Sequence, residues 1–374
     1  MNRKSKFSIV SVLALFIIVQ TTRAQDDILF RKSLVNSGIN GFFYGVAIDI
    51  IAESHGGASA GIPVIAAGVS ALIPLVTNST KTITPNSLVL SAHGKAIGWL
   101  HGFSLSTLIG GENAWNRDNY KLTVGLGAVS SISLGIIGNS LGKNTDWKEG
   151  QVALYRHYGW VMPMSGISFL VAISDEPRLW GASDLIFGAG SYFLAEKVYK
   201  NYPYTRGDVR SLQVLSILNG GLGLGILSDL SSRDEFSRGN LIFPAVGILS
   251  GTLIGQAWLK KANLTSKQGI QTAYAATGGA LLGFGISLLV QSDNLTPYYV
   301  IPYVTGLAAY GIALESMKKK NREAAYFSDK KKNNWDIAFM PQNLFLNSKI
   351  QNKGYFINGN FVGMQPLFSA SIKF

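Results

Sequence analysis

The chain has 374 residues, of which 47% are hydrophobic and only 14% are charged, and its mean hydropathy is +0.22. Soluble domains usually carry about 25% charged residues, so this composition favours a membrane protein over a soluble one. The net charge of +12 suits contact with anionic lipid and does not by itself indicate nucleic acid. The absence of cysteine excludes disulfides, thiolate nucleophiles and cysteine metal ligands.

The first 24 residues have the three parts of a secretory signal peptide. A basic start is followed by an apolar run from about Phe7 to Val19, and Thr22-Arg23-Ala24 places small residues where a signal peptidase reads. We therefore predict that residues 1–24 are a signal peptide and that the mature chain starts at Gln25. An uncleaved anchor helix is the alternative.

The mature chain is a succession of long apolar stretches separated by short polar breaks. Most have about 18–24 residues, which is enough to span a bilayer as a helix and exceeds the usual strand length. They lie near residues 34–52, 61–76, 87–110, 121–141, 151–173, 180–199, 210–228, 240–259, 268–291 and 296–314.

These stretches form pairs. Thr145, Thr205 and Thr265 recur at 60-residue intervals, and each is a candidate N-cap for the segment that follows. We predict an all-α fold of about ten apolar, glycine-rich helices in five helical-hairpin repeats, arranged as a stacked array. The hairpins fall at 25–84, 85–144, 145–204, 205–264 and 265–324, and together form a probable membrane domain over residues 25–324.

Glycines spaced by four mark the expected helix contacts. Residues four apart share a helix face, and glycine there lets another backbone approach closely. We expect leucine at Gly251 to overpack such a seam and alanine at Gly251 to be much milder. The candidate helix-packing residues are Gly94, Gly98, Gly102, Gly247, Gly251 and Gly255.

A barrel of about twenty short strands is the competing fold. Asn219-Gly220-Gly221 could form a hairpin turn, with Leu222, Leu224 and Ile226 alternating after it. The four-residue glycine spacing favours helices.

Charges divide between the loops: acidic residues gather within the hairpins and basic residues between them. If the leader is cleaved, the basic ends face away from the cytoplasm, which is opposite to the positive-inside rule. An ordinary inner-membrane transporter is therefore disfavoured. We expect an exported protein at the outer membrane or the periplasmic face of a Gram-negative envelope, either spanning a bilayer or forming a periplasmic bundle.

The C-terminal part has a different character. Residues 325–334 form a basic linker, and residues 335–374 are predicted to form a short β segment. Phe368, Ala370, Ile372 and Phe374 alternate with polar residues to the end of the chain. This pattern resembles the terminal strand of Gram-negative outer-membrane proteins.

Three ionisable residues within apolar stretches are candidate intramembrane polar groups: Asp49, Lys95 and Asp184. Each aspartate could pair with Lys95 or Arg156. His93 and His101 do not suit a metal pair, because eight residues separate them. The tyrosines of the last stretch fit an aromatic belt or core packing: Tyr298, Tyr299, Tyr303 and Tyr310.

We therefore expect no catalytic, cofactor-binding or metal residues. The preferred function is that of a non-enzymatic envelope membrane protein with a structural or scaffold role. Its partners would be the lipid bilayer and other envelope proteins, with no nucleic acid. The alternatives are a channel or carrier for a small solute and, third, an outer-membrane β-barrel.

Overall fold

The computed structural model describes residues 25–76, 83–232 and 237–330 and short strands between 335 and 372. The predicted signal peptide lies outside the described residues. The chain divides into two compact units, Met1–Leu314 and Glu315–Phe374.

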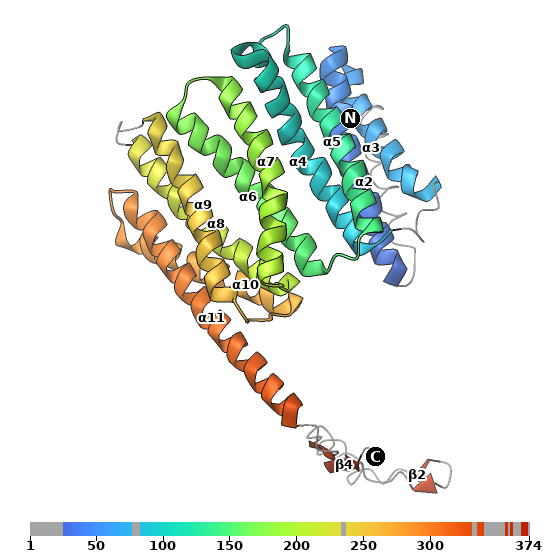
Figure 1. Cartoon of the computed structure of the whole chain (residues 1–374), viewed down its shortest axis with the longest axis vertical. Coiled ribbons are helices and arrows are strands. Elements are labelled where there is room, and N and C mark those ends of the chain that lie inside the picture. The colour runs from blue at the N-terminus through green and yellow to red at the C-terminus, as the bar shows by residue number, and fades with distance from the viewer. Residues whose placement is uncertain are drawn as a thin grey trace. The chain divides into compact units, whose positions relative to one another are not determined.

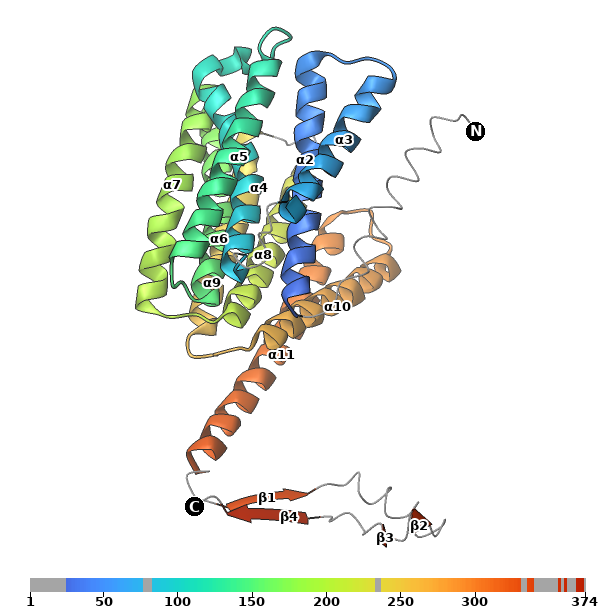
Figure 2. The same ribbon diagram turned by 90° about the vertical axis from the view of Figure 1, so that its right-hand side faces the viewer.

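Ten α-helices account for most of the described residues. Figures 1 and 2 draw them as coiled ribbons. Two 3₁₀ turns precede α5 and α9, at Gly111–Trp115 and Arg238–Leu241. The prediction of an all-α fold is confirmed for this part of the chain, and a barrel of strands through the same residues is not formed. The helices are α2 (Gln25–Ala52), α3 (Gly57–Val76), α4 (Pro85–Gly110), α5 (Tyr120–Asn144), α6 (Glu149–Ile173), α7 (Pro177–Asn201), α8 (Arg206–Ser232), α9 (Ile242–Leu259), α10 (Ser266–Val290) and α11 (Thr296–Lys330).

Threonine side chains start three of these helices. Thr84 and Thr265 each form a capping box with the residue three positions on, which satisfies backbone N–H groups that a helix start leaves open. Thr205 accepts a hydrogen bond from the backbone N–H of Asp208, which accepts one from Thr205 in return. Thr145 is not an N-cap: α6 starts at Glu149, and the Thr145 hydroxyl donates to the Leu141 carbonyl at the end of α5.

Helices adjacent in the chain pack against each other most extensively, in the pairs α2–α3, α4–α5, α6–α7 and α8–α9. Contacts between pairs run mainly through α4 with α7, α8 with α10, and α6 with both α8 and α9. Both views place α2, α3, α4 and α5 side by side (Figures 1 and 2). Helices α4, α6 and α8 therefore connect the later pairs, and α2 joins the first pair to α5 and α4.

The distribution of side chains is inverted relative to a water-soluble bundle. Many large apolar side chains are exposed, among them Leu289 at 83%, Phe193 at 80% and Ile312 at 74%. Small polar residues such as Ser131 and Thr272 are fully buried. A soluble protein rarely exposes so much contiguous apolar surface, whereas membrane helices pack through small residues and present large ones to lipid.

Seven helices among the described residues are long and apolar enough to cross a membrane. With the burial pattern, they identify a membrane protein with transmembrane helices. The segments are Leu29–Ala52, Gly57–Pro74, Tyr120–Asn144, Arg206–Ser232, Arg238–Leu259, Ser266–Val290 and Thr296–Glu323.

The second unit begins within α11. That helix continues to Lys330, so residues 325–330 of the expected linker are helical. Ala325 and Lys330 in this stretch are strong helix formers, and Glu315 and Lys318, earlier in the same helix, pair at 2.7 Å. Beyond it, β1 (Trp335–Phe339) pairs antiparallel with β4 (Phe368–Ile372), and β2 (Phe356–Ile357) pairs with β3 (Asn360–Phe361).

Candidate functional site

The first glycine face lies between α4 and α5. A β-carbon on Gly94 would overlap the backbone carbonyl of Leu134, and one on Gly98 or Gly102 would overlap the backbone of Ser131 or Gly127. The two helices therefore approach backbone to backbone along three successive turns. No residue larger than glycine fits these positions unless the helices separate.

The second glycine face lies between α9 and α8. A β-carbon on Gly247 or Gly251 would overlap the carbonyl of Asn219 or Leu215, respectively. At Gly255 the overlap is with the Leu212 side chain instead of a backbone atom. Two of the three glycines therefore lie at a rigid backbone contact, and the third faces a side chain that can move.

Asp184 is the most buried of the candidate polar residues. Its side chain has no exposed surface, and Oδ2 lies 2.6 Å from Nδ1 of His101 on α4. The other carboxylate oxygen, Oδ1, has no hydrogen-bond partner within the described residues. Asp184 thus pairs with His101 and not with Lys95 or Arg156, because α7 packs on the face of α4 that carries His101.

Lys95 and Asp49 do not join this pair. The aliphatic part of the Lys95 side chain lies against Gly135 of α5, so its stem covers the α4–α5 contact. Asp49 lies near the end of α2, and its Oδ1 is buried without a hydrogen-bond partner in the described residues. The structure leaves the three candidates in different helix contacts.

Two more histidines lie buried in neighbouring contacts. His93 lies against Gly159 of α6 and edge-on to the Trp160 ring, and neither ring nitrogen has a partner in the described part of the chain. His157 Nε2 lies 3.2 Å from the Thr252 hydroxyl, which lies 2.9 Å from Ser216. Sequence reasoning missed both contacts because each joins helices from different pairs.

Tyrosines of α11 form polar contacts with α8. Tyr310 is fully buried and bonds Ser211 at 2.8 Å, and Tyr303 donates to Asn219 at 3.1 Å. Tyr299 donates to Asp229 at 3.2 Å. These three tyrosines therefore contribute to the contact between α8 and α11.

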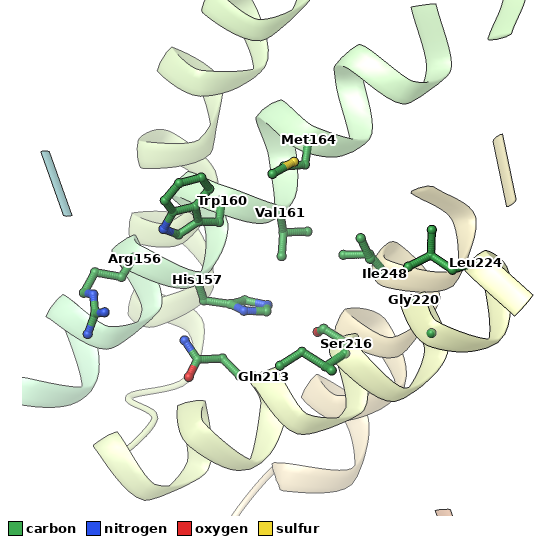
Figure 3. A pocket seen from close by; sticks show the side chains of 12 residues that line it. Arg156, His157, Trp160, Val161, Met164, Gln213, Ser216, Gly220, Leu224 and Ile248 are labelled. Atoms are coloured by element: carbon green, nitrogen blue, oxygen red, sulfur yellow. The ribbon is translucent and has the colours of Figure 1, made fainter. Parts of the chain in front are cut away.

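An apolar groove of about 480 Å³ lies between α6 and α8. Figure 3 shows the His157 ring pointing into this groove, with Arg156 at one end and Leu224 and Ile248 at the other. Gly220 and Gly221 lie in its α8 wall. We call this feature the α6–α8 groove.

Arg156 is exposed at the end of the α6–α8 groove, and within the described residues its guanidinium has no hydrogen bond or ion pair. It also lines a small cavity of about 30 Å³ together with Glu149 and Arg206. Arg206 and Glu149 pair with each other at 3.3 Å. Arg156 is therefore an uncompensated cation beside an apolar groove, a feature that sequence reasoning did not assign.

Charged residues at the helix ends form exposed pairs. Lys121, at the start of α5, lies 2.9 Å from Glu53 in the α2–α3 turn. The hydrogen bond from Lys121 lowers the pKa of Glu53 below its usual value. Among the described residues, no group of three or more His, Asp or Glu side chains is arranged to hold a metal ion.

No protein-family model, curated protein or solved structure matches this chain. Three features define the chain as a helical membrane protein: long apolar helices, large apolar side chains on their exposed faces, and helix contacts made through glycine and serine.

Proposed function

We propose that this chain is a non-enzymatic membrane protein of the cell envelope with a structural or scaffold role. In this proposal five helical hairpins form one closely packed array in a lipid bilayer, and its exposed surfaces contact lipid and other envelope proteins.

The observation that carries the proposal is the backbone contact at the glycine faces. Gly94 and Gly98 bring α4 onto α5, and Gly247 and Gly251 bring α9 onto α8. Close backbone contact gives extensive van der Waals packing between helices in lipid, where the hydrophobic effect between helices is absent. Such contacts favour a rigid array over one that opens and closes.

The hairpin repeat has support from two matching hydrogen bonds. The Thr84 hydroxyl, at the start of α4, donates to the Gly142 carbonyl near the end of α5 at 2.9 Å. The Thr205 hydroxyl, at the start of α8, donates to the Leu264 carbonyl after α9 at 2.6 Å. The two bonds span 58 and 59 residues, close to the proposed repeat length.

A fractionation experiment tests the membrane location. We expect the protein to stay in the pellet after alkaline carbonate extraction and its intact mass to correspond to a chain starting at Gln25. Release into the carbonate supernatant would refute the membrane array. Retention of Met1 would refute cleavage and would restore an inner-membrane location.

The proposed location is the outer membrane or the periplasmic face of the envelope. Density-gradient separation of the inner and outer membranes tests this location, and we expect the protein in the outer-membrane fraction. Its accumulation in the inner-membrane fraction would contradict this part of the proposal and leave the scaffold role intact.

A channel or carrier for a small solute is the second candidate, and the Asp184–His101 pair favours it. The pair is buried between α4 and α7, and a buried ionisable pair within a membrane protein is a functional candidate by default. Ion flux into liposomes containing the purified protein tests this function, with Asp184→Asn as the variant and Glu53→Gln, in an exposed turn, as the control. Flux that Asp184→Asn abolishes and Glu53→Gln preserves would favour the carrier over the scaffold. The scaffold predicts no flux above that of empty liposomes.

A further inference from the structure

We propose that the α6–α8 groove binds one anionic phospholipid of the surrounding bilayer. One acyl chain would lie between the two helices, and the headgroup phosphate would contact Arg156. This inference deepens the proposed function and rests on its membrane location.

The walls of the groove suit an acyl chain. Val161 and Met164 of α6, Ile217 and Leu224 of α8, and Ile248 of α9 line the groove, and Figure 3 shows Leu224 and Ile248 at the end away from Arg156. Gln213 and Leu224, at opposite ends of the α8 wall, are eleven residues apart, which corresponds to about 16 Å along a helix. The groove is therefore long and mostly apolar, which suits an extended hydrocarbon chain.

Gly221 keeps part of this groove empty. A β-carbon on Gly221 would meet no atom within 4 Å, whereas one on the adjacent Gly220 would overlap the Ile248 side chain. Gly221 thus does not serve a helix contact within the chain. Its missing side chain leaves space along the α8 wall that a ligand can occupy.

The Arg156 end of the groove suits an anionic headgroup. Its guanidinium has no partner in the described residues, and the same small cavity is lined by Arg206 and by Glu149, which pairs with Arg206. Arginine binds phosphate oxygens through two parallel N–H donors. Helices α6 and α8 also begin nearby, at Glu149 and Arg206, so the positive ends of their dipoles lie on the headgroup side. A zwitterionic headgroup would gain less from this end, because its own cation opposes these charges.

Quenching of tryptophan fluorescence tests the inference, because Trp160 lines the groove. The full mature protein in detergent micelles is titrated with phosphatidylglycerol that carries bromine on its acyl chains. Phosphatidylcholine with the same brominated chains is titrated in parallel. We expect saturable quenching by phosphatidylglycerol at an apparent affinity about tenfold or more above that of phosphatidylcholine. Trp160→Phe should remove the saturable component.

Two variants and two matched controls separate the headgroup site from the acyl site. Arg156→Gln should weaken phosphatidylglycerol binding about tenfold or more, since a hydrogen bond to a charged group is worth about that factor, and Arg156→Lys should weaken it less. Gly221→Leu should abolish saturable quenching. Lys143→Gln, an exposed cation at the end of α5, and Gly278→Leu, also a helical glycine with no atom within 4 Å of an added β-carbon, should bind as the parent does.

Several outcomes would overturn the inference. Equal binding of the two phospholipids, or parental binding by both Arg156→Gln and Gly221→Leu, would show that the groove is not an anionic-lipid site. Competition by soluble glycerol phosphate at equal affinity would assign the site to a free phosphate. A dimer that Gly221→Leu dissociates would assign the groove to a second copy of the chain.

The test is separable from that of the proposed function. Failure of lipid binding leaves retention in carbonate-extracted membranes unaffected. Release of the protein from those membranes, by contrast, would refute the membrane array itself. Helix content by circular dichroism must match the parent for each variant, and Arg156→Lys serves if Arg156→Gln does not fold.

Discussion

Replacement of Gly251 tests whether the α8–α9 contact is a backbone seam. The comparison uses the same substitutions at Gly278, which lies in the middle of α10 where an added β-carbon meets no atom within 4 Å. Both glycines are helical, so alanine improves intrinsic helix propensity by up to about 1 kcal/mol at each. The difference between the two positions therefore isolates the packing cost.

The geometry at Gly251 changes the expectation for alanine. A β-carbon there would overlap the Leu215 carbonyl and crowd the Ser216 α-carbon, and backbone atoms cannot rotate away as a side chain can. Overpacking of this kind costs about 1–3 kcal/mol. We therefore expect Gly251→Ala to be less stable than Gly278→Ala by about that amount, and not mild as the sequence suggests. Gly251→Leu should lose more, while Gly278→Leu should stay near the parent.

Thermal unfolding in detergent, followed by circular dichroism, ranks the four variants. The expected order of stability is Gly278→Ala, then parent and Gly278→Leu, then Gly251→Ala, and last Gly251→Leu. The seam would be refuted if Gly251→Ala melted with Gly278→Ala. A close backbone contact cannot accept a methyl group without a cost, so such a result would place α8 and α9 farther apart.

The remaining predictions concern three polar contacts, each measured by the same unfolding assay. Thr205→Ala removes a helix cap and should cost roughly 1–2 kcal/mol, whereas Thr145→Ala, which removes no N-cap, should cost less; equal losses would contradict the capping assignment. His101→Leu leaves the buried Asp184 carboxylate without its hydrogen bond and should cost about 1–3 kcal/mol, and an unchanged stability would show that the two side chains are not bonded. Tyr310→Phe keeps the packing and loses one hydrogen bond, so we expect a loss of about 0.5–1.5 kcal/mol and would reject the bond if the variant melted with the parent.

The helices could be predicted from sequence because their signals are local. The uncharged apolar runs 241–259 and 269–291 lie within α9 and α10 except for one residue at one end of each, and Thr265 marks the start of α10. The glycine faces could also be predicted, because residues four apart lie on one side of a helix. These signals depend only on residues within a few turns of one another.

The partners of polar residues could not be predicted, because they depend on which helix pairs meet. His101 and Asp184 are 83 residues apart, and His157 and Thr252 are 95 apart. No pattern within a helix specifies that α4 packs on α7 or α6 on α9. The end of α11 was missed for a different reason: residues 325–334 were predicted to be a basic linker, but α11 continues to Lys330, and Ala325 and Lys330 are good helix formers.

The threonine bonds that join the start of α4 to the end of α5, and the start of α8 to the turn after α9, have a consequence for folding. Both partners of each bond lie within about sixty residues of chain, so such a pair can close before the next pair is synthesised. Contacts between residues near in sequence form early and without long loop closures. Each pair of helices can therefore close as a unit and shield its own glycines before a neighbouring pair packs against it.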